Sequence, residues 1–286
     1  MSGDSTSLPK VKARLEELGV EPRESLGQHF LIDDETVATL ARTVSPGSLV
    51  IEVGAGVGQL TEALAGRAGR VIAIEIDRRF EPVLAQVAKD CQNVEVVFGD
   101  ALAVDFHRYI SKTDQKAQVV ASLPFHISEP FWQKIVDLPL SSITLMVGDR
   151  SAGAITAQSE ESPYFGQLTL LAQTFFDVNL LAEVKKSQFY PVPRTNAAIV
   201  RLLPRKEPEF RADRRLFLFR RLFLTAQKSP LIKNVLKEGL IEANQLTQNQ
   251  ARAIIAKMNL PPEVLDKPFG QLNNDDLKVL SRALRP

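Results

Sequence analysis

The chain has 286 residues, of which 44% are hydrophobic and 24% are charged, and its formal net charge is +1. This is the composition of a folded, soluble protein with one large core or with a large and a small domain. No apolar run approaches the about 20 residues of a membrane span. The single cysteine, Cys91, excludes an internal disulfide framework and favours the cytoplasm, and three scattered histidines (His29, His107, His126) indicate no metal site.

The near-neutral total charge hides an uneven distribution. Residues 1–200 carry 18 Lys and Arg against 25 Asp and Glu, whereas residues 201–286 carry 17 against 9. A basic carboxyl-terminal part on an acidic body is typical of a protein that holds a polyanion there. A solvated helical surface would give the same pattern, so the charge alone leaves both interpretations open.

The first predicted elements follow a tail that lacks the basic-then-apolar shape of a signal peptide. A short helix and a linker occupy 8–24, and Asp33 or Asp34 is placed to cap a helix over 35–44. Strands and helices then alternate, which predicts a parallel sheet covered on its faces. The predicted strands are 49–53, 70–76, 94–98, 118–121 and 142–147, and the predicted helices are 59–65, 78–89, one ending near 136, and 165–175.

The pattern changes in the last third of the chain. Segments 178–184 and 197–203 predict an antiparallel pair at an edge of the sheet, and only helices are predicted beyond Pro204. These helices are 211–225, 231–239, 248–258 and 274–284, with Pro261-Pro262 as a break. We therefore expect an amino-terminal tail and helix (1–24), an α/β domain (25–203) and a basic helical domain (204–286).

The segment from Val50 to Gln59 is the most informative one, because a buried strand runs into Gly54, Gly56 and Gly58 and then into a helix. Glycines let the backbone turn sharply at the strand end and approach a ligand closely. Glu75 ends the next strand about 20 residues on, where a carboxylate can hold a ribose diol. A dinucleotide fingerprint needs a glycine where Gln59 stands. The turn therefore favours S-adenosylmethionine, which has no pyrophosphate, over NAD.

Two further strand ends open on the same crevice. Asp100, after the third strand, can accept a hydrogen bond from the exocyclic amine of adenine. Ser122-Leu-Pro-Phe125, after the fourth, combines a side-chain oxygen and a turn carbonyl that can accept the two N–H bonds of a base amine, with an aromatic ring that can stack on a flipped base. Such a site works mostly by positioning.

Each of these residues also has a simpler structural explanation. Glu52 can cap a turn, Asp77 can cap the following helix, and Asp100 can form an Asx turn. Ser122-Leu-Pro-Phe125 can be an ordinary turn before a proline with a buried phenylalanine. For Glu52 and Asp77 taken alone we favour the capping role, but the spacing of the whole set favours a cofactor site.

At these residues the chain resembles the ribosomal RNA adenine N6-methyltransferases, and among them the KsgA-type small-subunit dimethyladenosine transferases. The resemblance rests on the segments Leu26–Leu31, Glu52–Gly56, Ile74–Asp77, Gly99–Ala101, Phe189–Arg194 and Ala197–Arg201. It implies a Rossmann-like, S-adenosylmethionine-dependent methyltransferase domain followed by a small all-helical domain. It also implies an enzyme that acts on rRNA of the immature small subunit. From the residues themselves we expect a cytoplasmic protein without a metal or a membrane, and a monomer is the simplest assumption.

The same resemblance implies the roles of individual residues. Catalytic roles fall to the substrate segment Ser122, Leu123, Pro124 and Phe125, with Phe125 as the stacking ring. Contacts to the cofactor fall to Gln28, His29, Leu31, Gly54, Gly56, Glu75, Asp100, Ala101 and Ser122. Ser122 stands where the family has an asparagine, and Gln227-Lys-Ser-Pro230 has two cations fewer than the family's segment. Because each cation that contacts a phosphate contributes to RNA affinity, we expect weaker binding there.

These departures keep other functions open. The chain can be a diverged paralogue that binds rRNA or the ribosome with weak or no methyl transfer, or that has another RNA target. A methyltransferase for a small molecule is a third hypothesis, which the basic helical domain argues against.

Overall fold

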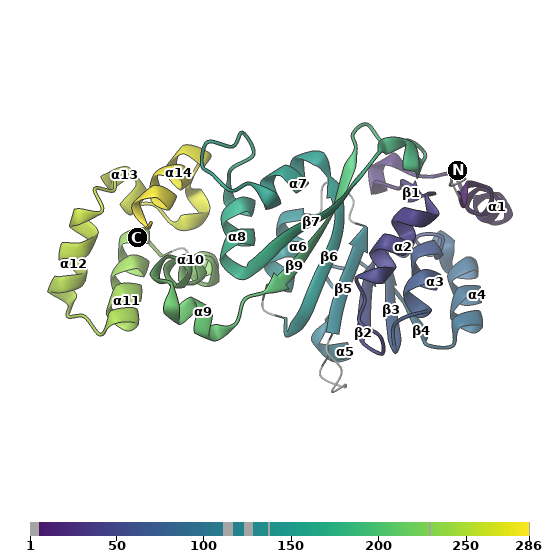
Figure 1. The fold of residues 1–286 in the computed structure, drawn as a ribbon, viewed down its shortest axis with the longest axis horizontal. Helices are drawn as coiled ribbons and strands as arrows, with labels where there is room; N and C mark the ends of the chain where they lie inside the picture. The colour runs from purple at the N-terminus through teal and green to yellow at the C-terminus, as the bar shows by residue number, and fades with distance from the viewer. Residues whose placement is uncertain (1–5, 111–116, 123–127, 137, 229, 286) are drawn as a thin grey trace. The chain divides into compact units, whose positions relative to one another are not determined.

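The structure is a computed structural model that describes residues 6–110, 117–122, 128–136, 138–228 and 230–285 (Figure 1). The chain divides into two compact units. The first comprises Met1–Ala152 and Asn179–Leu203, and the second comprises Gly153–Val178 and Pro204–Pro286. The domain boundaries expected at residues 24/25 and 203/204 stay a prediction, because a division into compact units does not show which part carries which function. None of the helices in the described ranges combines the length and apolar character that crossing a membrane requires.

The first unit is built on a twisted sheet. Its strands lie in the order β4-β3-β2-β5-β6-β9-β7, and β1 and β8 pair separately. The pairs β2–β3, β3–β4, β2–β5 and β5–β6 are parallel, whereas β6–β9 is antiparallel. The strands are β1 Phe30–Leu31, β2 Leu49–Val53, β3 Arg70–Glu75, β4 Val94–Phe98, β5 Ala117–Ser122, β6 Leu140–Gly148, β7 Phe176–Val184, β8 Phe189–Tyr190 and β9 Ala197–Pro204. The chain leaves β2 toward β3 on one side and returns to β5 on the other, which makes the edge beside β2 a topological switch point.

The helices alternate with the strands up to β6 and dominate afterwards. In the part of the chain that the structure describes they are α1 Leu8–Leu18, α2 Asp34–Arg42, α3 Gln59–Ala65, α4 Glu81–Cys91, α5 His107–Ile110, α6 Ser128–Ile135, α7 Asp149–Thr156, α8 Gln167–Phe175, α9 Glu207–Ala212, α10 Arg214–Thr225, α11 Ile232–Asn244, α12 Gln248–Lys257, α13 Pro262–Leu265 and α14 Asn274–Ala283. The predicted α/β alternation and the predicted helical carboxyl-terminal part are confirmed.

Burial explains why the central strands form where they do. All five residues of β2 are buried, so both faces of this strand are covered, as those of a central parallel strand must be, and four of the five side chains are apolar. The helix that precedes it begins at a cap, because the Asp33 carboxylate accepts a hydrogen bond from the Thr36 amide at 2.8 Å. Of the two predicted capping residues, Asp33 is therefore the one used.

The second unit has an apolar core of its own. Leu218 and Leu222 of α10 pack in it with Leu236 of α11, and all three are fully buried. Phe223 meets Phe269 edge-to-face at 4.8 Å between ring centroids. Amphipathic helices of this kind bury one stripe and leave the opposite face, with its charges, to the solvent.

One prediction for the helical part is wrong, and another is confirmed. The single helix expected over 211–225 is two helices, because the Asp213 carboxylate accepts hydrogen bonds from the Arg215 and Leu216 amides and thereby starts α10. The break expected at Pro261-Pro262 is confirmed, because α12 ends at Lys257 and Pro262 is the first residue of the next helix, α13. Proline is favoured at that position, since its φ suits a helix and its missing N–H would have had no partner.

We predict that Gly58→Ala destabilises the protein more than Gly47→Ala. Both glycines have positive φ, +82° and +74°, and alanine at such an angle costs about 1 kcal/mol or more. At Gly58 a Cβ atom would also lie 2.8 Å from Cγ2 of Val87, whereas at Gly47 nothing lies within 4 Å. In urea unfolding, the free energy of unfolding of Gly58→Ala should be lower than that of Gly47→Ala by about 1–3 kcal/mol. Equal losses of unfolding free energy in the two variants would show that helix α4, which carries Val87, shifts at no cost to make room for the Cβ atom.

Candidate active site

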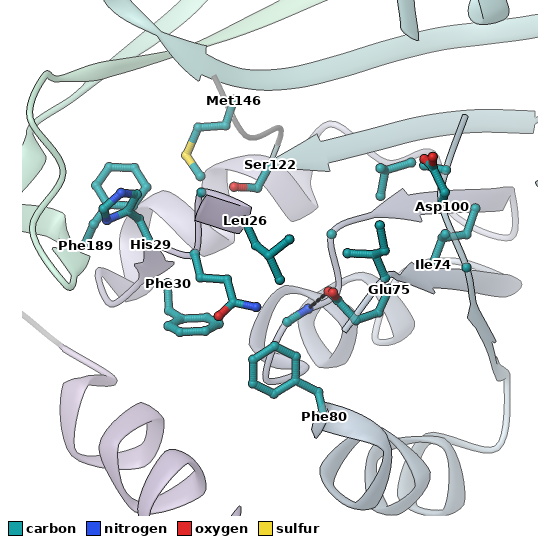
Figure 2. A pocket seen from close by; sticks show the side chains of 18 of the residues that line it. Leu26, His29, Phe30, Ile74, Glu75, Phe80, Asp100, Ser122, Met146 and Phe189 are labelled. Atoms are coloured by element: carbon teal, nitrogen blue, oxygen red, sulfur yellow. Dashed lines mark hydrogen bonds between the residues drawn. The ribbon is translucent and has the colours of Figure 1, made fainter. Parts of the chain in front are cut away.

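A pocket opens at the carboxyl edge of the sheet, where the topology switches (Figure 2). Its walls come from the ends of β2, β3 and β5, from the turn after β4 and from the segment between α1 and β1. Asp100 and Glu75 lie toward one end of the pocket, His29 and Phe189 toward the other, and Ser122 and Met146 between them. Binding sites in open parallel sheets lie at this edge because several strand ends and loops converge there.

The glycine turn forms the base of the pocket. The amides of Gly54 and Ala55 both donate to the Ile74 carbonyl, at 2.9 and 3.2 Å, which fastens the turn to the end of β3. Gly54 has φ +85°, and a Cβ atom there would lie 3.1 Å from the Ser122 carbonyl oxygen. Glycine therefore lets the turn pass close to the end of β5.

Glu75 lies where the sequence places the ribose acid. One carboxylate oxygen accepts the Gly56 amide at 2.7 Å and the other accepts the Asp77 amide at 2.9 Å. The residue is 6% exposed, and burial raises the pKa of its carboxyl although these amide bonds oppose the change. Each oxygen keeps a second acceptor site, so the carboxylate can also hold a hydroxyl of a ligand.

Asp100 both forms a turn and lines the pocket. One carboxylate oxygen accepts the Leu102 amide at 2.8 Å, which is an Asx turn, while the residue itself lines the pocket and is exposed. The turn fixes the side chain and leaves further acceptor capacity for an amine. The predicted Asx turn is confirmed, and the contact with an adenine amine stays a prediction. Ala101 is buried and lines the same wall.

The other end of the pocket combines polar and apolar groups. Ser122 ends β5 opposite Met146 of β6, and both line the pocket. His29 Nδ1 lies 2.8 Å from the Pro191 carbonyl oxygen, and because a carbonyl only accepts, Nδ1 is the donor. Leu31 lines a smaller neighbouring cavity that shares His29 and Ser122 with the first one. Leu123, Pro124 and Phe125 lie outside the described residues.

A short antiparallel pair joins two segments that are far apart in the sequence. Phe30 of β1 pairs with Tyr190 of β8, and Leu31 pairs with Phe189. This pairing brings the segments Leu26–Leu31 and Phe189–Arg194 together at one end of the pocket. The sequence shows both segments but gives no signal for their contact, because the separation is long and the strands are only two residues each.

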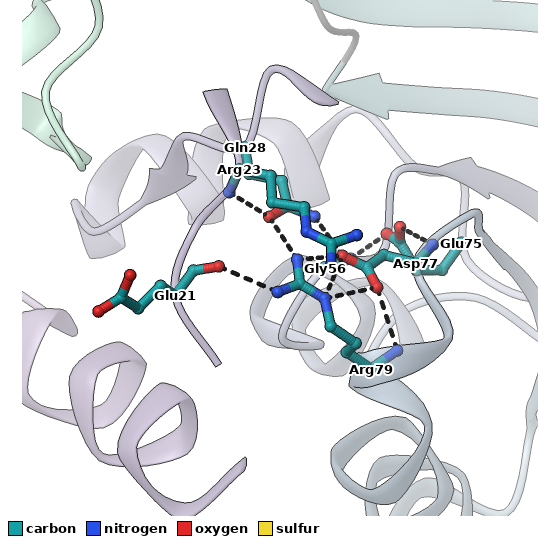
Figure 3. Close-up of polar contacts among 7 residues, drawn as sticks. All are labelled: Glu21, Arg23, Gln28, Gly56, Glu75, Asp77 and Arg79. Carbon is teal, nitrogen blue, oxygen red and sulfur yellow. Dashed lines mark hydrogen bonds and ion pairs between the residues drawn. The ribbon is translucent and has the colours of Figure 1, made fainter. Parts of the chain in front are cut away.

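Gln28 takes part in a polar network at the rim of the pocket (Figure 3). Its Nε2 donates to Asp77 at 2.8 Å, and its Oε1 accepts the Arg23 amide at 2.7 Å. Asp77 also accepts the Arg79 amide at 3.1 Å, which confirms its predicted capping role. Hydrogen bonds from the Arg79 guanidinium lower the pKa of Asp77 to about 2, so this carboxylate is ionised at neutral pH. The importance of Arg79 was not predicted.

Glu52 lies inside the sheet, behind the glycine turn, and does not cap a turn, so that expectation is wrong. It is 0% exposed, and among the described residues neither carboxylate oxygen has a partner with normal hydrogen-bond geometry. Burial raises the pKa of this carboxyl to about 8, although the nearby Thr61 hydroxyl opposes the change. A buried carboxyl without a cation avoids the charge by keeping its proton.

The strand order, the glycine turn and the pocket at the carboxyl edge define the Rossmann-like fold of S-adenosylmethionine-dependent methyltransferases. In the described residues no group of three or more His, Cys, Asp or Glu is arranged to hold a metal ion. The sequence profile described as "Ribosomal RNA adenine dimethylase" matches residues 19–266. The chain belongs to this family of rRNA adenine dimethyltransferases.

Individual relatives agree with the profile. A ribosomal RNA small subunit methyltransferase A of Listeria welshimeri is 34% identical over 227 residues, which cover 77% of each chain. One from a Geobacillus strain is 29% identical over 100% of this chain and 99% of its own. Among solved structures, a dimethyladenosine transferase from Plasmodium falciparum has a TM-score of 0.58 and 25% identity, covering 89% of this chain and 97% of its own. The 23S rRNA methyltransferase ErmE, at 23% identity and a TM-score of 0.57 over 89% and 99% of the chains, shares the fold.

We predict that the wild type loses stability relative to Glu52→Gln as the pH rises. Below about pH 4.5 the carboxyl is protonated in both the folded and the unfolded chain, and as the pH rises toward about 8 only the unfolded chain loses the proton. The raised pKa therefore contributes stability at low pH that is lost with rising pH. Between pH 5 and 8 the wild type should lose about 3 kcal/mol relative to the variant in urea unfolding. Parallel pH profiles would contradict a protonated Glu52.

Proposed function

We propose that the protein transfers methyl groups from S-adenosylmethionine to N6 of adenines in small-subunit rRNA during ribosome maturation in the cytoplasm. The observation that carries this proposal is the convergence of Glu75, Asp100 and Ser122 on one pocket at the carboxyl edge of the sheet. These three strand ends offer acceptors for a ribose, for an adenine amine and for the amine of a target base. Bound S-adenosylmethionine supplies an electrophilic methyl group on its sulfonium.

The residues of the pocket fit the cofactor by chemistry. Glu75 has acceptor capacity left for the ribose hydroxyls, and Asp100 is held by its turn in a position to accept the adenine amine. Phe80 and the exposed Ile76 provide apolar surface along the same wall. Gln28, His29, Gly54 and Gly56 supply polar groups and backbone around the remainder. A largely apolar cleft with a few fixed polar groups is what binds a small organic ligand with defined orientation.

The acceptor side of the reaction requires orientation more than acid–base chemistry. The lone pair of an adenine N6 amine is delocalised into the ring, so a hydroxyl and a backbone carbonyl that accept its two N–H bonds can turn that lone pair toward the methyl group. Ser122 provides the hydroxyl in this proposal, and the residues that follow it provide the carbonyl and the stacking ring Phe125. Catalysis then comes mainly from positioning.

The substrate assignment rests on the family and on charge. The relatives at 29–34% identity are methyltransferases of the small ribosomal subunit by name, and this chain spans most of their length. Residues 204–286 carry most of the excess positive charge, and we assign them to RNA binding. We propose a monomer. Because Ser122 stands where the family has an asparagine, a second function stays open, in which the protein binds rRNA but transfers methyl groups only weakly.

We predict methyl transfer to immature small-subunit particles that lack adenine N6 methylation. The assay follows labelled methyl from S-adenosylmethionine and separates N6-methyladenosine from N6,N6-dimethyladenosine after digestion, with large-subunit rRNA as the comparison. Dimethyladenosine in the small subunit is the expected product. Cofactor binding without incorporation into either subunit would contradict an active enzyme and favour the binding factor.

Ser122→Ala should lose most of the transfer rate, by about 100-fold, because the acceptor amine is no longer oriented. Its affinity for S-adenosylmethionine should stay within several-fold of the wild type. Ser141→Ala is the control, since this serine lies at the start of β6, donates its hydroxyl to the Ala117 carbonyl at 3.0 Å and is not among the residues that line the pocket. Full turnover by Ser122→Ala, measured at saturating cofactor, would remove Ser122 from the proposed mechanism.

A further inference from the structure

We propose that Arg79, through Asp77 and Gln28, is a positioning residue that holds the segment Glu21–Phe30 in place as one wall of the cofactor pocket. This inference rests on the proposed function, since it concerns the same pocket. Arg79 does not line the pocket itself, but Leu26, Gln28 and Phe30 do. Its effect on the cofactor is therefore indirect, through the segment that it holds.

The contacts of Arg79 converge on that segment (Figure 3). Its Nε donates to both carboxylate oxygens of Asp77 at 3.0 Å, and Nη2 donates to Asp77 Oδ2 at 2.5 Å. Nη2 also donates to Gln28 Oε1 at 3.3 Å, and Nη1 donates to the Glu21 carbonyl at 3.2 Å. One guanidinium therefore joins the end of β3 to two points of the segment. Such planar, charge-assisted bonds are stronger and more directional than those of a single ammonium.

Gln28 completes the connection from the other side. Its Nε2 donates to Asp77 Oδ2, and its Oε1 accepts the Arg23 amide, so the side chain links the segment to itself and to Asp77. The Asp77 side chain is 4% exposed and the Arg79 side chain is 27% exposed, which shields these bonds from competing water. A carboxylate in that position must stay paired, because an isolated buried charge is strongly unfavourable.

Other contacts of the segment are few: His29 Nδ1 donates to the Pro191 carbonyl at 2.8 Å, and Glu24 pairs with Arg194 at 2.8 Å between exposed side chains. No residue from 21 to 29 is buried, and the turn Glu24–Leu26 contributes no side chain to a core. Only at Phe30, which packs edge-to-face on Phe80 at 5.7 Å, does the segment join the core. Because no apolar side chain of the segment is fully buried before Phe30, its order depends largely on polar contacts. A wall that is ordered before binding spares the ligand the entropy of ordering it.

Removal of the guanidinium should therefore weaken cofactor binding without slowing the chemistry. In Arg79→Met we expect the Kd for S-adenosylmethionine, measured by calorimetry, to rise about 10-fold. The value of kcat at saturating cofactor should stay within about 2-fold, because the acceptor side of the pocket is unchanged. Arg78→Met is the matched control: Arg78 is the adjacent residue, its side chain is 70% exposed, and it pairs with Glu81 at 3.6 Å. The Arg78→Met variant should bind the cofactor with the affinity of the wild type.

Hydrogen exchange gives a second readout that needs no catalysis. The amides of Leu26, Gly27 and Gln28 donate to the Arg23 and Glu24 carbonyls, so they report the order of the segment. In the free Arg79→Met protein they should exchange about 10-fold faster than in the wild type and in Arg78→Met, and saturating cofactor should restore their protection. Arg79→Lys keeps the charge but cannot make all the bonds, so it should lie between the wild type and Arg79→Met in both measurements.

Two results would overturn the inference. One is wild-type affinity in Arg79→Met with unchanged exchange at residues 26–28. The other is a fall in kcat with an unchanged Kd, which would place Arg79 in the chemical step. Failure of the proposed function is distinguishable, because the wild type would then bind no S-adenosylmethionine, while the exchange comparison between Arg79→Met and Arg78→Met would still decide whether Arg79 holds the segment.

Discussion

The Gly56 amide donates a 2.7 Å hydrogen bond to the Glu75 carboxylate, and this bond joins the glycine turn to the end of the neighbouring strand. Two further amides of the turn, Gly54 and Ala55, donate to the Ile74 carbonyl beside it. The turn can follow this path because Gly54 lacks a side chain that would meet the Ser122 carbonyl. The ends of β2, β3 and β5 are thereby fixed against one another, and the pocket takes its base from them.

Two acids near the end of β3 have opposite electrostatic surroundings. Glu75 is bonded only by neutral amides and is buried, so its pKa is raised, whereas Asp77 faces the Arg79 guanidinium and its pKa is lowered. Glu75 faces the pocket and keeps acceptor capacity for a ligand. Asp77 is committed to the network that holds Gln28. In the proposed function the ligand-binding role thus falls to Glu75, and the architectural role falls to Asp77, two residues further along the chain.

The parts of the fold that depend on local pattern were predictable from the sequence. The strand 94–98 and the helix 59–65 were predicted to the residue, because each is an apolar pattern bounded by turn residues. The pocket residues at strand ends were predictable for the same reason, since parallel topology alone brings them to one edge. The pairing of β1 with β8 and the bonds of Arg79 were not, because they join segments far apart in sequence. The break at Asp213 was missed because its capping carboxylate lies within a continuous helical pattern.

We propose that the pocket at the carboxyl edge holds S-adenosylmethionine with its ribose on Glu75 and its adenine on Asp100. A crystal structure of the protein with S-adenosylhomocysteine, the demethylated product, tests this most directly. We expect ribose hydroxyls within hydrogen-bond distance of Glu75, the adenine amine on Asp100, and the sulfur atom at the Ser122 end of the pocket. A ligand bound elsewhere, or bound there with its ribose away from Glu75, would contradict it.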